Sequence, residues 1–245
     1  LHPNGQLDPS TYALVGEAYA EVEKSVPWCV GSTNVADIGL LSAESVGVPR
    51  DNAADIGANR ILLETHALYD VLDPSMDFDR YRALILPDLI DIDDALKAKL
   101  DAYLAQGGKL LLSGASGLSP DGSGFLFDVG ASYEGEGVYE PDYLLPREDL
   151  RASFVDSPLV MYLKAHRIRV TDGESLGDVY QPYFNRTFRH FCSHQHTPPR
   201  DEPSGYACGV RKGGIVYLAH PAFSVYAGYG AVAYKEYLGN VLDSL

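Results

Sequence analysis

The sequence is poor in basic residues and in cysteine, and it contains no long hydrophobic run. Nineteen lysines and arginines stand against 34 aspartates and glutamates, so the formal net charge at pH 7 is 19 − 34 = −15. An acidic surface repels the phosphates of nucleic acids and of anionic membranes. No apolar run approaches the roughly 20 residues that a membrane-spanning helix needs. The sequence therefore predicts neither a nucleic acid nor a membrane as a partner.

The three cysteines, Cys29, Cys192 and Cys208, are odd in number and form no Cys-x-x-Cys pair. Their scarcity excludes a small disulfide-bonded scaffold and favours reduced thiols in the cytoplasm. The first residue is Leu1 rather than methionine, and no signal-peptide pattern follows it. We expect that a longer polypeptide precedes this chain.

The composition that remains is that of a globular protein, with 46% apolar and 22% charged residues. Residues 1–33 are predicted to form a leading helix and a linker. Asp8 can cap this helix, Pro9 suits its first position, and Pro27 is expected to end it. One apolar stripe recurs at three- and four-residue steps: Leu14, Val15, Ala18, Tyr19 and Val22.

Residues 34–245 are predicted to form the main domain. Strands are expected at 35–41, 81–86 and 109–112, and they alternate with helices at 52–72 and after Asp91 or Asp93. Leu68 and Leu72 are expected on the buried side of the 52–72 helix. Apolar strands that alternate with amphipathic helices are typical of a parallel sheet covered on both faces. We therefore predict a three-layer, flavodoxin-like α/β fold.

An irregular insertion is expected at about 114–204, because glycine, proline and polar residues dominate there. It is predicted to hold a short helix at 124–129, a strand at 166–170 and a polar loop at 186–204. A strand–turn–strand unit at 206–219 and a final helix at 225–242 complete the predicted domain.

Two chemical groups are expected at the carboxyl edge of the parallel sheet, where open α/β sheets bind ligands. The first is the turn at 113–117, which misses the nucleophile-elbow pattern G-x-S-x-G because Leu118 stands at the last glycine position. The second is His220, which follows the last strand and could act as a general base. A plain glycine–serine turn is the favoured interpretation, and a small hydrolase that uses Ser116 and His220 is the alternative.

The His220-Pro221 pair and the glycine-rich turn resemble the class I glutamine amidotransferase fold. In that family a cysteine nucleophile sits at the turn, and a late strand ends in His-Pro-Glu. Here Ala115 and Ser116 occupy the turn, and Ala222 stands where the glutamate would be. The resemblance therefore implies the fold without glutaminase activity.

A second resemblance covers most of the chain. It rests on Pro27-Trp28-Cys29, on the segments 81–87 and 106–111, and on Gly214-Ile215-Val216-Tyr217. These segments are similar to the amidotransferase-like domain that follows the catalytic barrel in many glycoside hydrolases, of which the beta-galactosidase trimerisation domain is an example. The resemblance implies an upstream barrel with the catalytic carboxylates, and a homo-oligomer. It also implies a non-catalytic accessory domain that contributes subunit contacts and sometimes the rim of the active site.

The segment 190–196 places His190, Cys192, His194 and His196 on one face if it is extended. Alternate residues on a strand are about 6.7 Å apart, whereas zinc bonds are about 2.0–2.3 Å long. At most two neighbours in this row can reach one ion, so no metal is predicted, although these four residues are the candidates. The segment is either a solvated loop or a loop that reaches a sugar site through Arg186, Arg189, His194 and His196.

No cofactor is predicted, and abundant carboxylates such as Glu134, Glu136, Glu140, Asp142, Glu148 and Asp149 are explained as solvated loop residues. Tyrosine is frequent, with 17 residues. Tyr226, Tyr229, Tyr234 and Tyr237 are expected in the core or at a subunit interface rather than at a sugar.

Overall fold

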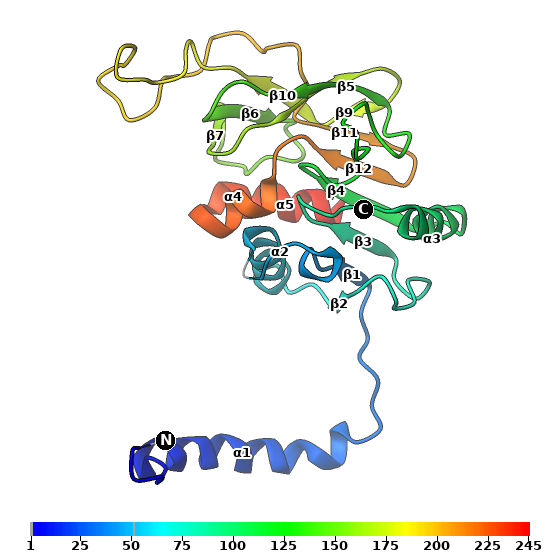
Figure 1. Ribbon diagram of the computed structural model, residues 1–245, viewed down its shortest axis with the longest axis vertical. Coiled ribbons are helices and arrows are strands. Elements are labelled where there is room, and N and C mark those ends of the chain that lie inside the picture. The colour runs from blue at the N-terminus through cyan, green and yellow to red at the C-terminus, as the bar shows by residue number, and fades with distance from the viewer. Residues whose placement is uncertain (1, 51) are drawn as a thin grey trace. The chain divides into compact units, whose positions relative to one another are not determined.

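The computed structural model describes residues 2–50 and 52–245, and the chain divides into two compact units, Leu1–Val35 and Ala36–Leu245 (Figure 1). The first unit contains α1 (Pro9–Cys29). As predicted, Asp8 caps this helix by accepting a hydrogen bond from the Thr11 N–H at 2.8 Å. Pro27 does not end it, because the fixed φ of proline is itself helical and the Val30 N–H still donates to the Val26 carbonyl at 3.0 Å. None of the residues of α1 is buried.

No helix among residues 2–50 and 52–245 is long and apolar enough to cross a membrane.

The second unit is built on a seven-stranded sheet with the order β2-β1-β3-β4-β12-β11-β9. The first five strands of this order are parallel, and β11 and β9 are antiparallel to their neighbours. This confirms a mixed α/β fold with a mostly parallel central sheet. The strands are β1 (Ile38–Leu41), β2 (Tyr69–Leu72), β3 (Ala83–Leu86), β4 (Lys109–Ser113), β9 (Glu174–Ser175), β11 (Gly209–Lys212) and β12 (Ile215–Leu218).

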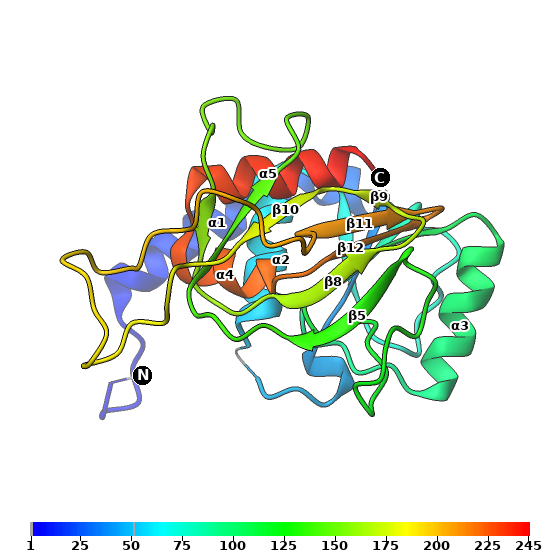
Figure 2. The same ribbon diagram turned by 90° about the horizontal axis from the view of Figure 1, so that it is seen from above.

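Helices lie on both faces of this sheet (Figures 1 and 2). Leu40, Ile85 and Leu111 belong to the hydrophobic core with α2 (Ala53–Glu64), α4 (Ala222–Tyr229) and α5 (Val232–Asp243). The alternating residues Leu41 and Leu84 belong to the core with α3 (Asp94–Ala105). Because successive strand residues point to opposite faces, apolar strands need cover on both.

The segment 114–204 is more regular than the sequence indicates. It contains a three-stranded antiparallel sheet, β10-β6-β7, and the antiparallel pair β5-β8. Their bounds are β5 (Ala131–Glu136), β6 (Asp142–Pro146), β7 (Leu159–Met161), β8 (His166–Val170) and β10 (Gly177–Tyr180). The strand expected at 166–170 is confirmed. The short helix expected at 124–129 is wrong, because Phe125 instead forms a β-bridge with Leu118.

Two predicted helices are too long. The helix expected at 52–72 ends at Glu64, since His66 adopts a positive φ of 58° that helical residues do not, and β2 follows. Leu68 is consequently 56% exposed, and Leu72 is buried in a strand instead. The helix expected at 225–242 is two helices, α4 and α5, because Gly230 adopts the left-handed conformation with φ 54°.

Candidate functional site

The carboxyl ends of β3, β4 and β12 bring together Asp88, the turn 113–117 and His220, as the topology predicts for the last two. Asp88, which follows β3, is fully buried. Ser113 Oγ donates to Asp88 Oδ1 at 2.6 Å, and the Asp88 N–H donates back to Ser113 Oγ at 3.0 Å. The Ser224 N–H and Oγ both donate to Asp88 Oδ2, at 2.6 and 2.7 Å.

These bonds explain why a carboxyl group is stable in the interior. Burial raises the pKa of Asp88, and the hydrogen bonds from Ser113 and Ser224 oppose that rise. Ser224 lies in the first turn of α4, whose N-cap residue is Pro221 and provides no side-chain cap. The Asp88 carboxylate therefore caps α4 from the end of a distant strand, where its charge also suits the helix dipole. This role was not predicted from the sequence, where the signal for it is a carboxylate directly after a buried strand.

Ser116 and His220 make separate interactions in the interior. Ser116 is fully buried, and its Oγ accepts a hydrogen bond from the Ile90 N–H at 2.9 Å. His220 is 1% exposed, and its Nε2 lies 2.5 Å from Asp142 Oδ1 on β6. Among the described residues no hydrogen bond joins Ser116 to His220, and His220 Nδ1 is buried without a partner. A histidine–carboxylate pair enclosed in this way connects β12 to β6, and neither group reaches solvent.

A second histidine lies beside this pair. His166 Nδ1 is 3.3 Å from the Tyr133 hydroxyl, so β8 and β5 are joined at this point. Burial, followed by the proximity of His220, lowers the pKa of His166. Cys208 is equally enclosed, and burial raises the pKa of its thiol to about 12. At neutral pH this thiol is protonated and is a poor nucleophile.

The segment 186–197 forms an exposed loop that projects from the second unit (Figures 1 and 2). Within it, the Arg186 guanidinium donates to the Gln195 carbonyl at 3.0 Å, and the Cys192 thiol donates to the carbonyls of His194 and His196. Across residues 2–50 and 52–245 no three His, Cys, Asp or Glu side chains are placed to share a metal ion. The structure therefore does not gather His190, Cys192, His194 and His196 around one point.

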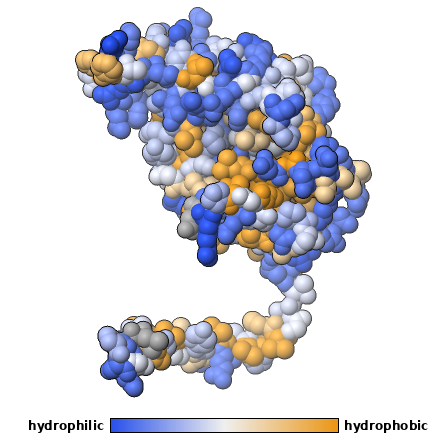
Figure 3. Space-filling view, in the orientation of Figure 1, coloured by the Kyte–Doolittle hydropathy of each residue, from blue (hydrophilic) through white to orange (hydrophobic). Residues whose placement is uncertain are grey.

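The root of this loop is fixed to the sheets, whereas its tip is open to solvent. The Tyr143 hydroxyl donates to the Thr197 carbonyl at 2.6 Å, and the Asn185 amide donates to the Val138 carbonyl at 2.7 Å. The ring of Tyr162 on the segment after β7 lies 5.3 Å from that of His196. At the tip Phe188 is 85% exposed, and hydrophobic and hydrophilic side chains mix on the projecting loop (Figure 3).

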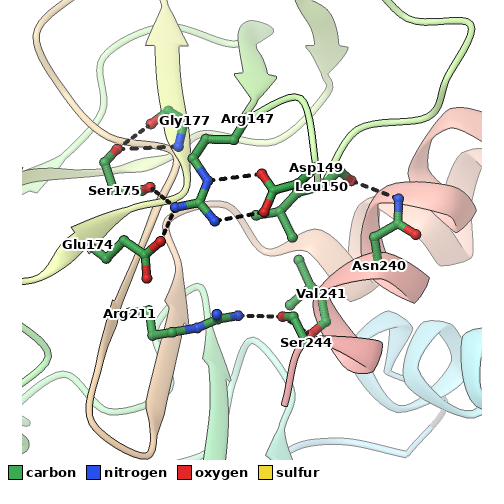
Figure 4. Close-up of polar contacts among 10 residues, drawn as sticks. All are labelled: Arg147, Asp149, Leu150, Glu174, Ser175, Gly177, Arg211, Asn240, Val241 and Ser244. Carbon is green, nitrogen blue, oxygen red and sulfur yellow. Dashed lines mark hydrogen bonds and ion pairs between the residues drawn. The ribbon is translucent and has the colours of Figure 1, made fainter.

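The other predicted residues have structural roles in the described part of the chain. Tyr226, Tyr234 and Tyr237 are buried in the core, as expected, while Tyr229 is 55% exposed and stacks on Tyr162. Of the predicted loop carboxylates, Asp142 is buried against His220 rather than solvated. Figure 4 shows that Arg147 bridges Asp149 and Glu174, while Arg211 contacts Ser244 at the end of α5.

Comparison with known proteins gives a family match for part of the chain. Residues 59–126 match the family model of the beta-galactosidase trimerisation domain. The whole chain overlays an alpha-L-fucosidase isoenzyme 2 from Paenibacillus thiaminolyticus with 39% identity and a TM-score of 0.90, and covers 38% of that protein. The resemblance to the trimerisation domain is therefore supported over residues 59–126. No match was found among curated proteins.

More distant structures share the fold alone. A GH42 beta-galactosidase from G. stearothermophilus is 15% identical with a TM-score of 0.62, over 99% of this chain and 34% of that one. A ThuA-like protein from Bacteroides uniformis is 10% identical with a TM-score of 0.56, over 86% of this chain and 91% of that one. The chain thus spans little more than a third of the glycoside hydrolases that it matches.

Proposed function

We propose that this chain is a non-catalytic assembly domain of a glycoside hydrolase. It would hold copies of the enzyme together and contribute to the rim of the sugar site on a catalytic barrel that precedes it in the same polypeptide. The observation that carries this proposal is the 39% identity with the fucosidase over the full length of this chain. The trimerisation-domain match over residues 59–126 supports the assembly role.

The loop at 186–197 is the part that we assign to the sugar site. Its root is fixed by Tyr143 and Asn185, so its side chains are presented from a defined base. Arg186, Arg189, His194 and His196 can donate hydrogen bonds to sugar hydroxyls or carboxylates. The names of the similar enzymes, which include a fucosidase and beta-galactosidases, support a sugar as the ligand of this loop.

We also propose that the domain is a three-layer, flavodoxin-like member of the amidotransferase-like folds without glutaminase chemistry. Five parallel strands with helices on both faces support the fold class. The turn at 113–117 carries no cysteine, and Ala222 follows His220-Pro221. The enclosed environments of Ser116 and His220 favour the assembly role over a hydrolase.

Three free cysteines support a cytoplasmic location.

Sedimentation of this chain at several concentrations tests the assembly role. We expect a homo-oligomer whose mass is a whole multiple of the monomer. A second measurement titrates the chain against its separately produced upstream barrel. A chain that remains monomeric at every concentration and shows no affinity for that barrel would contradict the proposal.

A further inference from the structure

We propose that a hollow at the root of the projecting loop is a binding site for a neutral saccharide. It has a volume of about 420 Å³ and lies on two segments, 181–183 and 200–204. Its lining is rich in polar side chains and includes one aromatic ring: Gln181, Tyr183, Arg200, Asp201, Glu202 and Ser204. It is distinct from the buried cluster around Asp88 and from the tip of the loop.

The backbone beneath the hollow is held by hydrogen bonds between the two segments. The Arg200 N–H donates to the Gln181 carbonyl at 2.9 Å, and the Ser204 N–H donates to the Val179 carbonyl at the same distance. Ser204 Oγ adds a second bond to the Val179 carbonyl at 2.7 Å. The side chains therefore project from a paired and ordered base, which limits the entropy that binding would cost.

The side chains offer the two kinds of contact that a sugar makes. Tyr183 is 50% exposed, and the Arg200 guanidinium carbon lies 5.9 Å from the centre of its ring. An exposed aromatic ring can cover the apolar C–H face of a pyranose, and planar amide, guanidinium and carboxylate groups match pairs of hydroxyls. Polar lining of this kind suits a ligand that carries many hydroxyl groups.

The polar groups are also free to accept a ligand. Among the described residues, no hydrogen bond or ion pair is made by the side chains of Gln181, Arg200, Asp201 and Glu202. By contrast, the Arg147 guanidinium is already bound by two carboxylates and could not take a ligand in this way. Two carboxylates and one guanidinium give the hollow a net charge of about −1, which disfavours an anionic ligand. The chemistry therefore points to a neutral polyhydroxylated ligand.

This site deepens the proposed function and rests on it for its biological meaning. The hollow lies on the same two segments that lead into and out of the loop at 186–197. If that loop borders the sugar site of the barrel, the hollow would hold outer units of an oligosaccharide whose end occupies the barrel. The domain would then favour extended substrates over single sugars.

The test is a titration of this 245-residue chain with lactose and with fucosyllactose, followed by NMR of the tyrosine rings and by calorimetry. We expect saturable binding of at least one sugar, with a Kd on the order of 1 mM. Tyr183→Ala should weaken binding at least tenfold, and Tyr183→Phe should retain it because the ring face remains. Tyr12→Ala removes another half-exposed tyrosine and should leave the Kd unchanged.

Absence of saturation by both sugars would overturn the proposal, as would equal affinities of the wild type and Tyr183→Ala. Circular dichroism of each variant establishes that the fold is intact, and Arg200→Ala provides an independent variant if Tyr183→Ala is unfolded. These outcomes are separate from those that test the proposed function, because sedimentation and affinity for the barrel do not depend on Tyr183.

Discussion

At the scale of single residues, Asp88 is a fully buried carboxylate that holds three elements together. Asp88 connects β3, β4 and the first turn of α4 through Ser113 and Ser224. Its backbone φ of 43° lies in the left-handed region, where aspartate is better tolerated than most residues. The carboxyl edge of the sheet, where open α/β sheets bind ligands, therefore holds a helix cap at this position.

Removal of this carboxylate should therefore destabilise the fold strongly. Asp88→Ala leaves the buried Ser113 hydroxyl and the partly buried Ser224 N–H without their acceptor, and it places alanine at a positive φ. We expect a loss of about 3 kcal/mol or more in the free energy of unfolding, measured in urea. Asp91→Ala, at an exposed carboxylate nearby, should change that free energy by less than about 0.5 kcal/mol. A loss for Asp88→Ala no larger than that of the control would contradict the role as a cap.

His166 should make the stability depend on pH. Its pKa is lowered in the folded state by burial, so the unfolded chain binds the proton more tightly. The stabilisation is complete above the unfolded pKa of about 6.5, and it is lost as the pH falls toward the lowered folded value. We expect His166→Gln to flatten the decline in unfolding free energy below pH 6.5, as measured in urea at a series of pH values.

The exposed His194 provides the control for this measurement. His194→Gln should leave the pH dependence of the wild type in place, because this side chain lies on the exposed loop, away from the partly buried His166. If His166→Gln and the wild type lost the same free energy between pH 8 and pH 5, the assignment to His166 would be wrong.

At the scale of elements, α2 and α4 approach each other closely. A Cβ atom added at Gly57 would lie 1.8 Å from the Phe223 carbonyl oxygen, so the two helix backbones nearly touch there. Gly57→Ala must push the helices apart, and we expect it to cost about 2–3 kcal/mol of unfolding free energy. Thermal and urea unfolding of the variant would measure this.

Gly228 in α4 is the matched control, since nothing lies within 4 Å of a Cβ at that position. Gly228→Ala should be neutral or stabilise the protein by up to about 1 kcal/mol, because alanine is the better helix former. Equal effects at Gly57 and Gly228 would show that the helices are not in close contact.

The elements that could be predicted from the sequence are those with a local signal. β3 and β4 are short apolar runs, and Asp93 caps α3 by accepting from the Leu96 N–H, so each is visible within a few residues. In β2 the apolar residues continue the spacing of the buried face of the helix before it, so the sequence predicts a longer helix. This segment is a strand that pairs with β1. β5 is polar on alternate residues, and its paired residues on β8 are 30 to 39 positions away in the chain.

The same distinction applies to the candidate site. The turn 113–117 and His220 could be placed at one sheet edge because parallel strands end together. The position of Asp88 directly after a buried strand marks it as a candidate, but its partner Ser224 is 136 residues away in the chain. Asp142 carries no comparable signal, and its partner His220 is 78 residues away. Both pairs become buried only in the complete fold. From the sequence alone, an aspartate, a serine and a histidine look the same whether they are reactive or structural.

At the scale of the whole molecule, the charge is unevenly distributed. The projecting loop at 186–197 contains two arginines and three histidines and no acidic residue, within a chain of net charge −15. The remainder therefore carries −15 − 2 = −17. A cationic projection on an acidic body is suited to reach a surface lined by carboxylates, and glycoside hydrolases carry paired carboxylates at the reacting sugar.

This asymmetry leads to a test on the full-length glycoside hydrolase to which we propose that the chain belongs. Replacement of residues 187–194 by a glycine–serine segment removes the exposed tip but retains the anchors at Asn185 and Thr197. We expect kcat/KM for an aryl glycoside to fall at least tenfold, which corresponds to about 1.4 kcal/mol of lost transition-state interaction. Sedimentation should show an unchanged oligomer, because the role proposed for the tip is at the sugar site and not in the fold. The same replacement at the exposed turn 120–123 should change neither quantity, and an unaltered kcat/KM for the loop variant would remove the loop from the sugar site.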